Sequence, residues 1–177
     1  MTKFIPNILT TEQCVNLVKQ FDIEKHKYLS ADAKWLTGNS FGFRSKSIEF
    51  NKYMDILKPK MLEFYPENVT LQNVNTYVRE YINNSMLGRH IDRTDIGITL
   101  SICLELNIKT DWPLCAKING EEKCFNLNVG DALLMTTAYQ TPHWRDVLVC
   151  DENERVVQLF IHWKETEFTS KQTKTIV

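Results

Sequence analysis

The side chains in this sequence best suited to metal chemistry are His90, Asp92 and His143. His90 and Asp92 are two residues apart, and such residues point to the same face of an extended strand, so an imidazole and a carboxylate can be directed at one point. His143 follows much later, in Thr-Pro-His-Trp-Arg-Asp. Two histidines and one carboxylate are a known ligand set for a divalent metal. We therefore take these three residues as candidate catalytic metal ligands.

A His-x-Asp triplet also occurs by accident, so its surroundings decide whether it counts. Here the triplet follows Gly88 and a predicted strand, and His143 lies in a proline-containing loop directly after another predicted strand. Two histidines and a carboxylate leave three positions of an octahedral iron open on one side, where a bidentate co-substrate and dioxygen can bind. Zinc more often takes a tetrahedral ligand set and supports hydrolysis. The ligand set therefore favours iron.

Arg155 is the candidate anion anchor. If residues 155–163 form a strand, Arg155 lies on the odd-numbered face, which is otherwise apolar. A charge in that position needs an anionic partner. Bidentate contact with the carboxylate of a small ligand would supply one, and the alternative is an ion pair with an acidic neighbour such as Glu154 or Asp151. His162 lies on the opposite face from Arg155, which argues against it as a metal ligand.

Three further polar residues accompany this set. Tyr77 and Tyr81 share one face of the predicted strand that leads to the triplet. A tyrosine hydroxyl beside an arginine would complete a carboxylate pocket, and a buried structural tyrosine fits the same pattern. Arg145, two residues after His143, is either a second anion contact or a surface partner for Asp146, and we favour the surface pair.

Composition limits the class of protein. The chain has 177 residues, 43% of them hydrophobic, and 21 basic against 22 acidic side chains. We expect one domain over residues 1–177, no general attraction to nucleic acid or anionic lipid, and a cytoplasmic location, because neither a signal peptide nor a membrane span of about 18 apolar residues is visible. The five scattered cysteines include no Cys-x-x-Cys, so we expect them to be reduced core residues.

The hydrophobic pattern divides the chain into a helical flank over about 8–65 and a β-barrel core over about 69–165. Thr10 and Gln13 form a capping box at the start of one helix, and a second helix covers about 50–65 with Pro59 expected to kink or divide it. Residues 23–43 are irregular, which indicates a long loop or short edge strands that carry Phe41, Phe43 and Arg44. Strands are expected at 69–71, 74–81, 96–106, 116–118, 123–127, 132–135 and 155–163. Asn119-Gly120 predicts a hairpin. Many short strands without helices between them favour an antiparallel barrel or sandwich.

Together these residues resemble the iron(II)- and 2-oxoglutarate-dependent dioxygenases, in particular the prolyl 4-hydroxylase-like branch. The matches are Tyr81, His90-Ile91-Asp92, the Gly130-Asp131 turn, Pro142-His143-Trp144-Arg145, and Arg155 at the start of the last strand. The resemblance implies a mostly β fold, the double-stranded β-helix or cupin-like jelly roll, with the N-terminal helices packed on one sheet. It also implies that His90, Asp92 and His143 bind Fe(II), and that Arg155 holds 2-oxoglutarate with Tyr81 or Tyr77 beside it.

The implied activity is hydroxylation of a C–H bond in a peptidyl, prolyl-like or small-molecule substrate. It would use O2 and 2-oxoglutarate, release succinate and CO2, and take ascorbate as a candidate reductant. Trp35, Arg44 and Trp112 are candidates for the substrate rim. The family's Gly-Gly pair is absent, and Asp111-Trp112-Pro113-Leu114 stands in its place, so the substrate-side wall is expected to differ.

Two other functions fit parts of the pattern. One is a catalytically silent, cupin-like metal-binding or interaction protein. The other is a nucleic-acid demethylase, which the near-neutral charge and the absence of any arginine after Arg155 disfavour. The sequence does not indicate an oligomeric state or name the substrate.

Overall fold

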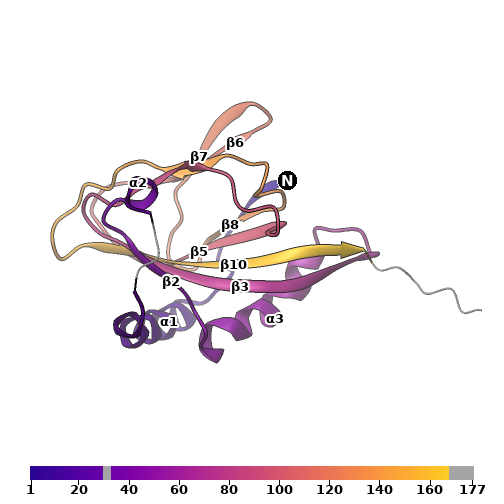
Figure 1. Ribbon diagram of the computed structural model, residues 1–177, viewed down its shortest axis with the longest axis horizontal. Coiled ribbons are helices and arrows are strands. Elements are labelled where there is room, and N and C mark those ends of the chain that lie inside the picture. Colours follow the sequence, from indigo (N-terminus) through magenta and orange to yellow (C-terminus); the bar gives the residue numbers. More distant parts are fainter. Residues whose placement is uncertain (30–32, 168–177) are drawn as a thin grey trace, which may run out of the picture.

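Two antiparallel sheets make up the body of the protein, and the computed structural model describes residues 1–29 and 33–167 of it. The six-stranded sheet has the order β1-β8-β5-β10-β3-β2, and the four-stranded sheet has the order β4-β9-β6-β7. Figure 1 shows the two sheets as stacked layers, with the helices α1 and α3 beneath the larger one. The larger sheet is therefore covered on both faces.

The bounds of the elements follow chain order. The N-terminal half contains β1 (Thr2–Ile5), α1 (Thr11–Glu24), a 3₁₀ turn (Lys25–Lys27), α2 (Lys34–Thr37), β2 (Phe41–Arg44), α3 (Ile48–Leu62) and β3 (Val69–Tyr81). The C-terminal half contains β4 (Leu87–His90), β5 (Ile98–Asn107), β6 (Leu114–Ile118), β7 (Glu121–Phe125), β8 (Ala132–Met135), β9 (His143–Arg145) and β10 (Arg155–Glu167).

From β3 onward the chain alternates between the two sheets. β3, β5, β8 and β10 belong to the larger sheet, and β4, the β6–β7 hairpin and β9 belong to the smaller one. This winding is a double-stranded β-helix of the jelly-roll type. The predicted fold class is confirmed, including the helices packed on one sheet. The alternation brings β4 and β9, which carry the histidines, into direct contact.

The helices form where the sequence predicts them. At the start of α1 the Gln13 amide donates to Thr10 Oγ1 over 3.2 Å and the Thr10 amide donates to Gln13 Oε1 over 2.8 Å, so both halves of the capping box are present. α3 runs through Pro59 as one helix, so the expected division of this helix is wrong. Its buried stripe extends from Phe50 to Met61, and packing of that stripe on the sheet outweighs the one hydrogen bond that proline removes.

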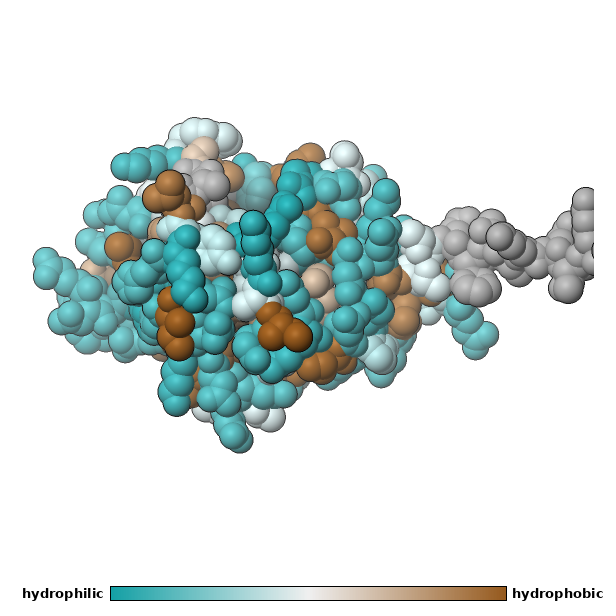
Figure 2. All heavy atoms as spheres, turned by 60° about the horizontal axis from the view of Figure 1, so that its bottom comes forward, coloured by the Kyte–Doolittle hydropathy of each residue, from teal (hydrophilic) through white to brown (hydrophobic). Residues whose placement is uncertain are grey.

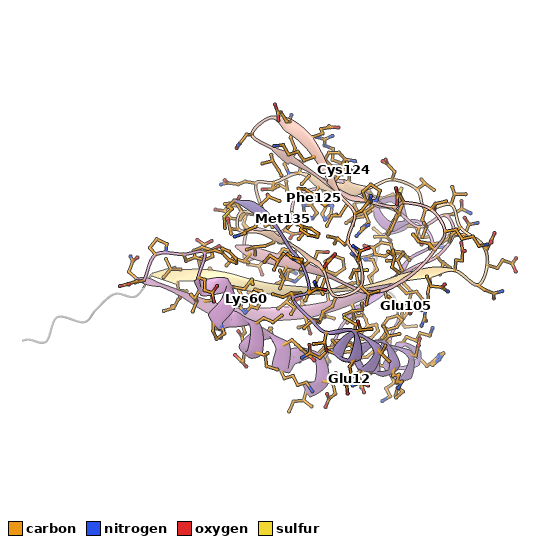
Figure 3. All side chains as sticks on the ribbon, turned by 180° about the vertical axis from the view of Figure 1, so that it is seen from behind. Glu12, Lys60, Glu105, Cys124, Phe125 and Met135 are labelled. Carbon is orange, nitrogen blue, oxygen red and sulfur yellow. A yellow bond between two sulfur atoms is a disulfide. The ribbon has the colours of Figure 1, made fainter. Side chains whose placement is uncertain are left out.

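Two hydrophobic cores lie on the two faces of the larger sheet. One core, between this sheet and the helices, includes Phe21, Phe50, Leu100, Leu159 and Trp163. The other lies between the sheets and includes Tyr81, Leu87, Cys103, Trp112, Leu133 and Met135. In Figure 3 Cys124 and Phe125 of the hairpin lie on one side of the larger sheet and Glu12 of α1 on the other. The outer face of the helices is largely hydrophilic (Figure 2).

Several short elements were not predicted. The segment 23–43, expected to be a long loop or short edge strands, contains the edge strand β2 as one of these alternatives had it, but also α2, which was not predicted. Its residues 30–32 lie outside the described part of the chain. β1, β4 and β9 were not predicted. Each has only three or four residues of mixed polar and apolar character, whereas the equally short β8 was predicted from an unbroken apolar run.

The cysteine prediction is wrong for one pair. Cys115 and Cys124 form a disulfide, with sulfur atoms 1.95 Å apart, across the β6–β7 hairpin. Asn119 and Gly120 make the turn with φ of 52° and 86°, and the two cysteines are equally distant from it along the chain. The hairpin was predicted, so its register already placed these two residues opposite each other. Cys14 and Cys103 are buried free thiols, as expected.

The disulfide predicts a labelling pattern. Iodoacetamide should modify three cysteines of the urea-unfolded protein without reductant and all five after reduction, as measured by mass spectrometry. A loop of this size contributes about 2–3 kcal/mol to stability by restricting the unfolded chain, so reduction should lower the free energy of unfolding by up to that amount. Five modified cysteines without reductant would contradict the pairing.

Candidate metal centre and active site

Strand pairing brings the three candidate ligands together. His90 is the cross-strand partner of His143 in the β4–β9 pair. Asp92 follows β4, where its amide donates to the carbonyl of Ala138 over 3.1 Å. The Nε2 atoms of His90 and His143 each lie 3.7 Å from Asp92 Oδ1. All three ligand atoms lie within 4.8 Å of one another, which is the spacing of a metal site.

Hydrogen bonds to the backbone fix the direction of both imidazoles. His90 Nδ1 lies 2.8 Å from the carbonyl oxygen of Gly88, and His143 Nδ1 lies 2.9 Å from that of Thr141. A carbonyl oxygen only accepts, so each Nδ1 carries the proton and each Nε2 presents its lone pair to the centre. Thr99 Oγ1 donates to Asp92 Oδ2, which leaves Oδ1 directed at the histidines. Metal ligands in proteins are commonly oriented by hydrogen bonds of this kind.

The protonation states of Asp92 and His143 also suit the binding of a cation. Burial raises the pKa of Asp92, but the adjacent His90, His143 and His162 and the Thr99 hydroxyl outweigh it and hold this pKa well below its usual range. Burial lowers the pKa of His143 despite the Asp92 charge, so its imidazole is neutral at pH 7. An ionised carboxylate beside a neutral imidazole is the protonation state that binds a metal. The donor set therefore fits Fe(II), with coordination positions left for a ligand.

A cavity of about 160 Å³ adjoins the three ligands. Besides the ligands, the side chains that line it include Tyr77, Arg79, Ser101, Met135, Phe160 and His162. Figure 3 shows Met135 in the layer between the two sheets. A groove next to the cavity is lined by Trp35, Arg44, Ile91 and Arg93 and shares His90 and Asp92 with it. The site is thus a cavity beside the metal ligands, with an adjoining groove of mixed aromatic and basic character.

Arg155 lies away from the cavity, so its predicted role as the anion anchor of the site is corrected. Its Nη1 atom lies 2.8 Å from Asp22 Oδ1 and 2.9 Å from Glu80 Oε1, and its Nη2 atom lies 2.8 Å from Glu105 Oε2. The described residues that line the cavity do not include it. Arg155 therefore links α1 to β3 and β5, and the ion pairs involve acids other than Glu154 and Asp151.

The prediction for Arg155 failed because the odd-numbered face of β10 points toward the helices, and the even-numbered face points toward the cavity. The odd-numbered residues Val157, Leu159, Ile161 and Trp163 belong to the core beneath the helices. The even-numbered Phe160 and His162 line the cavity. The odd face is the more apolar one, so sequence reasoning took it for the interior of the barrel. The larger sheet has a core on each face, and the functional cavity is on the other side.

The remaining candidates divide between the site and the core. Tyr77 lines the cavity, and its contact with a co-substrate stays a prediction. Tyr81 is fully buried with its ring centroid 4.8 Å from that of Trp112. Trp112 is buried, so its assignment to the substrate rim is wrong, whereas Trp35 is 77% exposed beside the site. Arg145 is also buried, so the surface pair with Asp146 is wrong.

Sequence reasoning missed several polar residues of this region. Thr99, Ser101 and Arg79 line the cavity, and none was singled out as a site residue. His162 was set aside as a ligand, yet it also lines the cavity, and burial lowers its pKa to about 4. The sequence nevertheless contains a signal for this side of the barrel. Gln158 and His162 are polar residues on the even face of an otherwise apolar strand, and buried polar residues of this kind mark a face with a function beyond packing.

Within the described residues, we find no helix with the length and apolar character that crossing a bilayer requires.

The fold has known counterparts, although sequence comparison finds none. No family model matches the chain, and no curated protein matches it. A prolyl 4-hydroxylase from Pseudomonas putida superposes with a TM-score of 0.71 at 12% identity, over 92% of this chain and 91% of that one. HygX from Streptomyces hygroscopicus, solved with nickel and 2-oxoglutarate bound, gives a TM-score of 0.70 at 10% identity, over 92% and 82%.

A third similar structure is a prolyl hydroxylase from Trichoplax adhaerens, in complex with a peptide fragment of the hypoxia-inducible factor. Its TM-score is 0.67 at 14% identity, over 92% of this chain and 83% of that one. The chain has the fold of the 2-oxoglutarate and iron(II) oxygenases. The resemblance to the prolyl 4-hydroxylase-like branch is confirmed for the fold. Its His-Asp-His cluster lines the cavity described above.

Thr99 provides a test of the metal centre. Thr99→Val removes the hydroxyl that donates to Asp92 while keeping the shape of the side chain, so the carboxylate is less firmly oriented. We expect Mn(II) affinity, measured by calorimetry, to fall about 10- to 100-fold. Thr110→Val, at an exposed threonine outside the site, is the control. Unchanged Mn(II) affinity in Thr99→Val would contradict the support role.

Arg155 provides a test of the corrected assignment. Arg155→Gln removes the cation that Glu105 pairs with and leaves Asp22 and Glu80 with their second cation, Lys25. We expect the free energy of unfolding in urea to fall by about 1–3 kcal/mol. Lys109→Gln removes an exposed pair with Asp151 and should change it by less than about 0.5 kcal/mol. A loss of Mn(II) binding in Arg155→Gln would place this residue at the metal site instead.

Proposed function

We propose that the protein is an iron(II)- and 2-oxoglutarate-dependent dioxygenase that hydroxylates a C–H bond of a peptide or small-molecule substrate. Succinate and CO2 would be its co-products, O2 its oxidant and ascorbate a reductant. The observation that supports this most is the convergence of both Nε2 atoms on Asp92 Oδ1 beside a cavity. We also propose that it acts in the cytoplasm.

The contacts of each residue in the site indicate the role that we propose for it. His90 and His143 would hold Fe(II) through Nε2, because Nδ1 of each is engaged by a carbonyl oxygen. Asp92 would hold it through Oδ1 and supply negative charge, while Thr99 keeps the other oxygen in place. The bound iron supplies activation of dioxygen coupled to oxidative decarboxylation of a 2-oxo acid. Met135 and Phe160 present apolar surface to the cavity, which limits access of water.

The groove beside the cavity is the proposed approach for the substrate. Trp35 exposes most of its surface there, and Arg44 and Arg93 line the same groove. An exposed aromatic ring beside the Arg44 cation suits a peptide or small molecule with an apolar part and an acidic group, whereas Arg93 is already paired with Asp95. Asp92 and His90 border both the groove and the cavity, so a substrate lying in the groove would reach the metal ligands.

One observation favours a second candidate function. The arginine expected to hold 2-oxoglutarate is engaged with three carboxylates away from the cavity. A metal-binding protein of the same fold without turnover would show this arrangement. The two candidates differ in whether the metal-loaded protein converts 2-oxoglutarate.

The decisive measurement is succinate formation from labelled 2-oxoglutarate with Fe(II) and ascorbate. We expect the wild-type protein to release succinate and Asp92→Ala to release none, with Mn(II) affinity lowered by more than about 100-fold because a direct ligand is lost. The free energy of unfolding should change by no more than about 1 kcal/mol.

Asp95→Ala is the matched control, since Asp95 is exposed, close in sequence and paired with Arg93. It should keep both metal binding and succinate formation. Metal binding without succinate in the wild-type protein would support the silent metal-binding protein, and succinate from Asp92→Ala would contradict the assigned site.

A further inference from the structure

Arg145 is a buried cation whose environment calls for an anion. The residue is 3% exposed, and its Nε atom has no hydrogen-bond partner. Nη1 donates to the carbonyl oxygen of Trp112, and the guanidinium carbon lies 4.5 Å from the centroid of the Trp112 ring. No acidic side chain in the described ranges, 1–29 and 33–167, forms an ion pair with it. Burying a charge this way is costly unless a counter-charge is supplied.

The position of Arg145 relates it to the metal centre. Arg145 and His143 are two residues apart on β9 and are both buried, so they share the face that is turned into the barrel. Their Cα atoms are roughly 6.6 Å apart along the strand. Leu87, the cross-strand partner of Arg145, lines the cavity with the metal ligands. Arg145 therefore lies two residues further along β9 than the metal ligand His143, on the same face and next to a residue that lines the cavity.

Two more side chains with unpartnered polar atoms lie in this part of the barrel. Gln158 of β10 is 0% exposed, and neither Nε2 nor Oε1 has a partner. Ser101 of β5 is fully buried, its Oγ has no partner, and it lines the cavity. Buried polar groups in native proteins are nearly always hydrogen-bonded, so such a cluster indicates a missing ligand.

Cys103 connects these residues. It is the cross-strand partner of Gln158 and lies two residues from Ser101 on the same face of β5. Cys103 also belongs to the buried cluster that contains Trp112 and Leu87, the two neighbours of Arg145. In agreement with this packing, the charge of Arg145 opposes the rise that burial causes in the pKa of Cys103. Arg145, Gln158 and Ser101 therefore surround one region between the sheets, adjacent to the cavity that holds the metal ligands.

We propose that Arg145, with Gln158 and Ser101, binds the distal carboxylate of 2-oxoglutarate. This inference rests on the proposed function and names the residues that select a dicarboxylate. The terminal carbons of 2-oxoglutarate are roughly 5 Å apart when the chain is extended, with C–C bonds of about 1.5 Å. That length is comparable to the step from His143 to Arg145. Arg145 donates to the carboxylate, the Gln158 amide adds a donor, and the Ser101 hydroxyl adds another.

The test compares two 2-oxo acids on Mn(II)-loaded protein by calorimetry. 2-Oxoglutarate carries the distal carboxylate, and 2-oxobutanoate has the same metal-binding end without it. We expect wild-type protein to bind 2-oxoglutarate about 10- to 100-fold more tightly than 2-oxobutanoate. In Arg145→Gln this preference should disappear, while the affinities for Mn(II) and 2-oxobutanoate change less than about twofold.

Arg155→Gln is the matched control, because it removes the other arginine considered for this role and should keep the preference intact. Gln158→Leu should reduce the preference several-fold, and it provides a second measurement if Arg145→Gln does not fold. Loss of the preference in Arg155→Gln, or its persistence in both Arg145→Gln and Gln158→Leu, would overturn the inference. Failure of wild-type Mn(II) protein to bind either 2-oxo acid would instead overturn the proposed function itself.

Discussion

The pairing of β4 with β9 is the constraint on which the site depends. It places His90 directly opposite His143, although the two residues are far apart in the sequence. Two backbone carbonyls then hold the Nδ1 atoms, so that the free nitrogens point at Asp92. Because main-chain groups provide this orientation, the ligand geometry is formed by the fold itself. On its other side β9 pairs with β6, where Ala116 is the partner of His143, so the smaller sheet holds the pair in place.

Local signals in the sequence were sufficient for much of the fold. The capping box of α1 and the Asn119-Gly120 hairpin each depend on a few adjacent residues, and both are present. β4 and β9 were not predicted, because each is short and mixes polar with apolar residues, whereas the equally short β8 is a continuous apolar run. The His-x-Asp triplet was nevertheless recognised, since the chemistry of its side chains does not depend on the length of the strand. The Cys115–Cys124 disulfide was missed although the predicted hairpin implied it.

The two arginines show where sequence reasoning reaches its limit. Arg155 and Arg145 both follow His143 and both lie on strands. Alternation correctly grouped Arg155 with Val157 and Leu159, but it cannot say which face of a strand looks into the barrel when each face packs against a core of its own. Only the three-dimensional structure shows three carboxylates around Arg155 and none around Arg145 among the described residues. The partners of a charge, more than its place in the sequence, distinguish a structural ion pair from a ligand contact.

The two faces of β10 place different requirements on their side chains. On one side Leu159 and Ile161 need only fill volume against the helices, so another aliphatic side chain of similar size can replace them. On the other side Gln158 and His162 face the interior of the barrel, where the identity of each polar atom matters. Tolerance to substitution along this strand should therefore alternate with a period of two. Genetic variation would affect stability at one residue and ligand selection at the next.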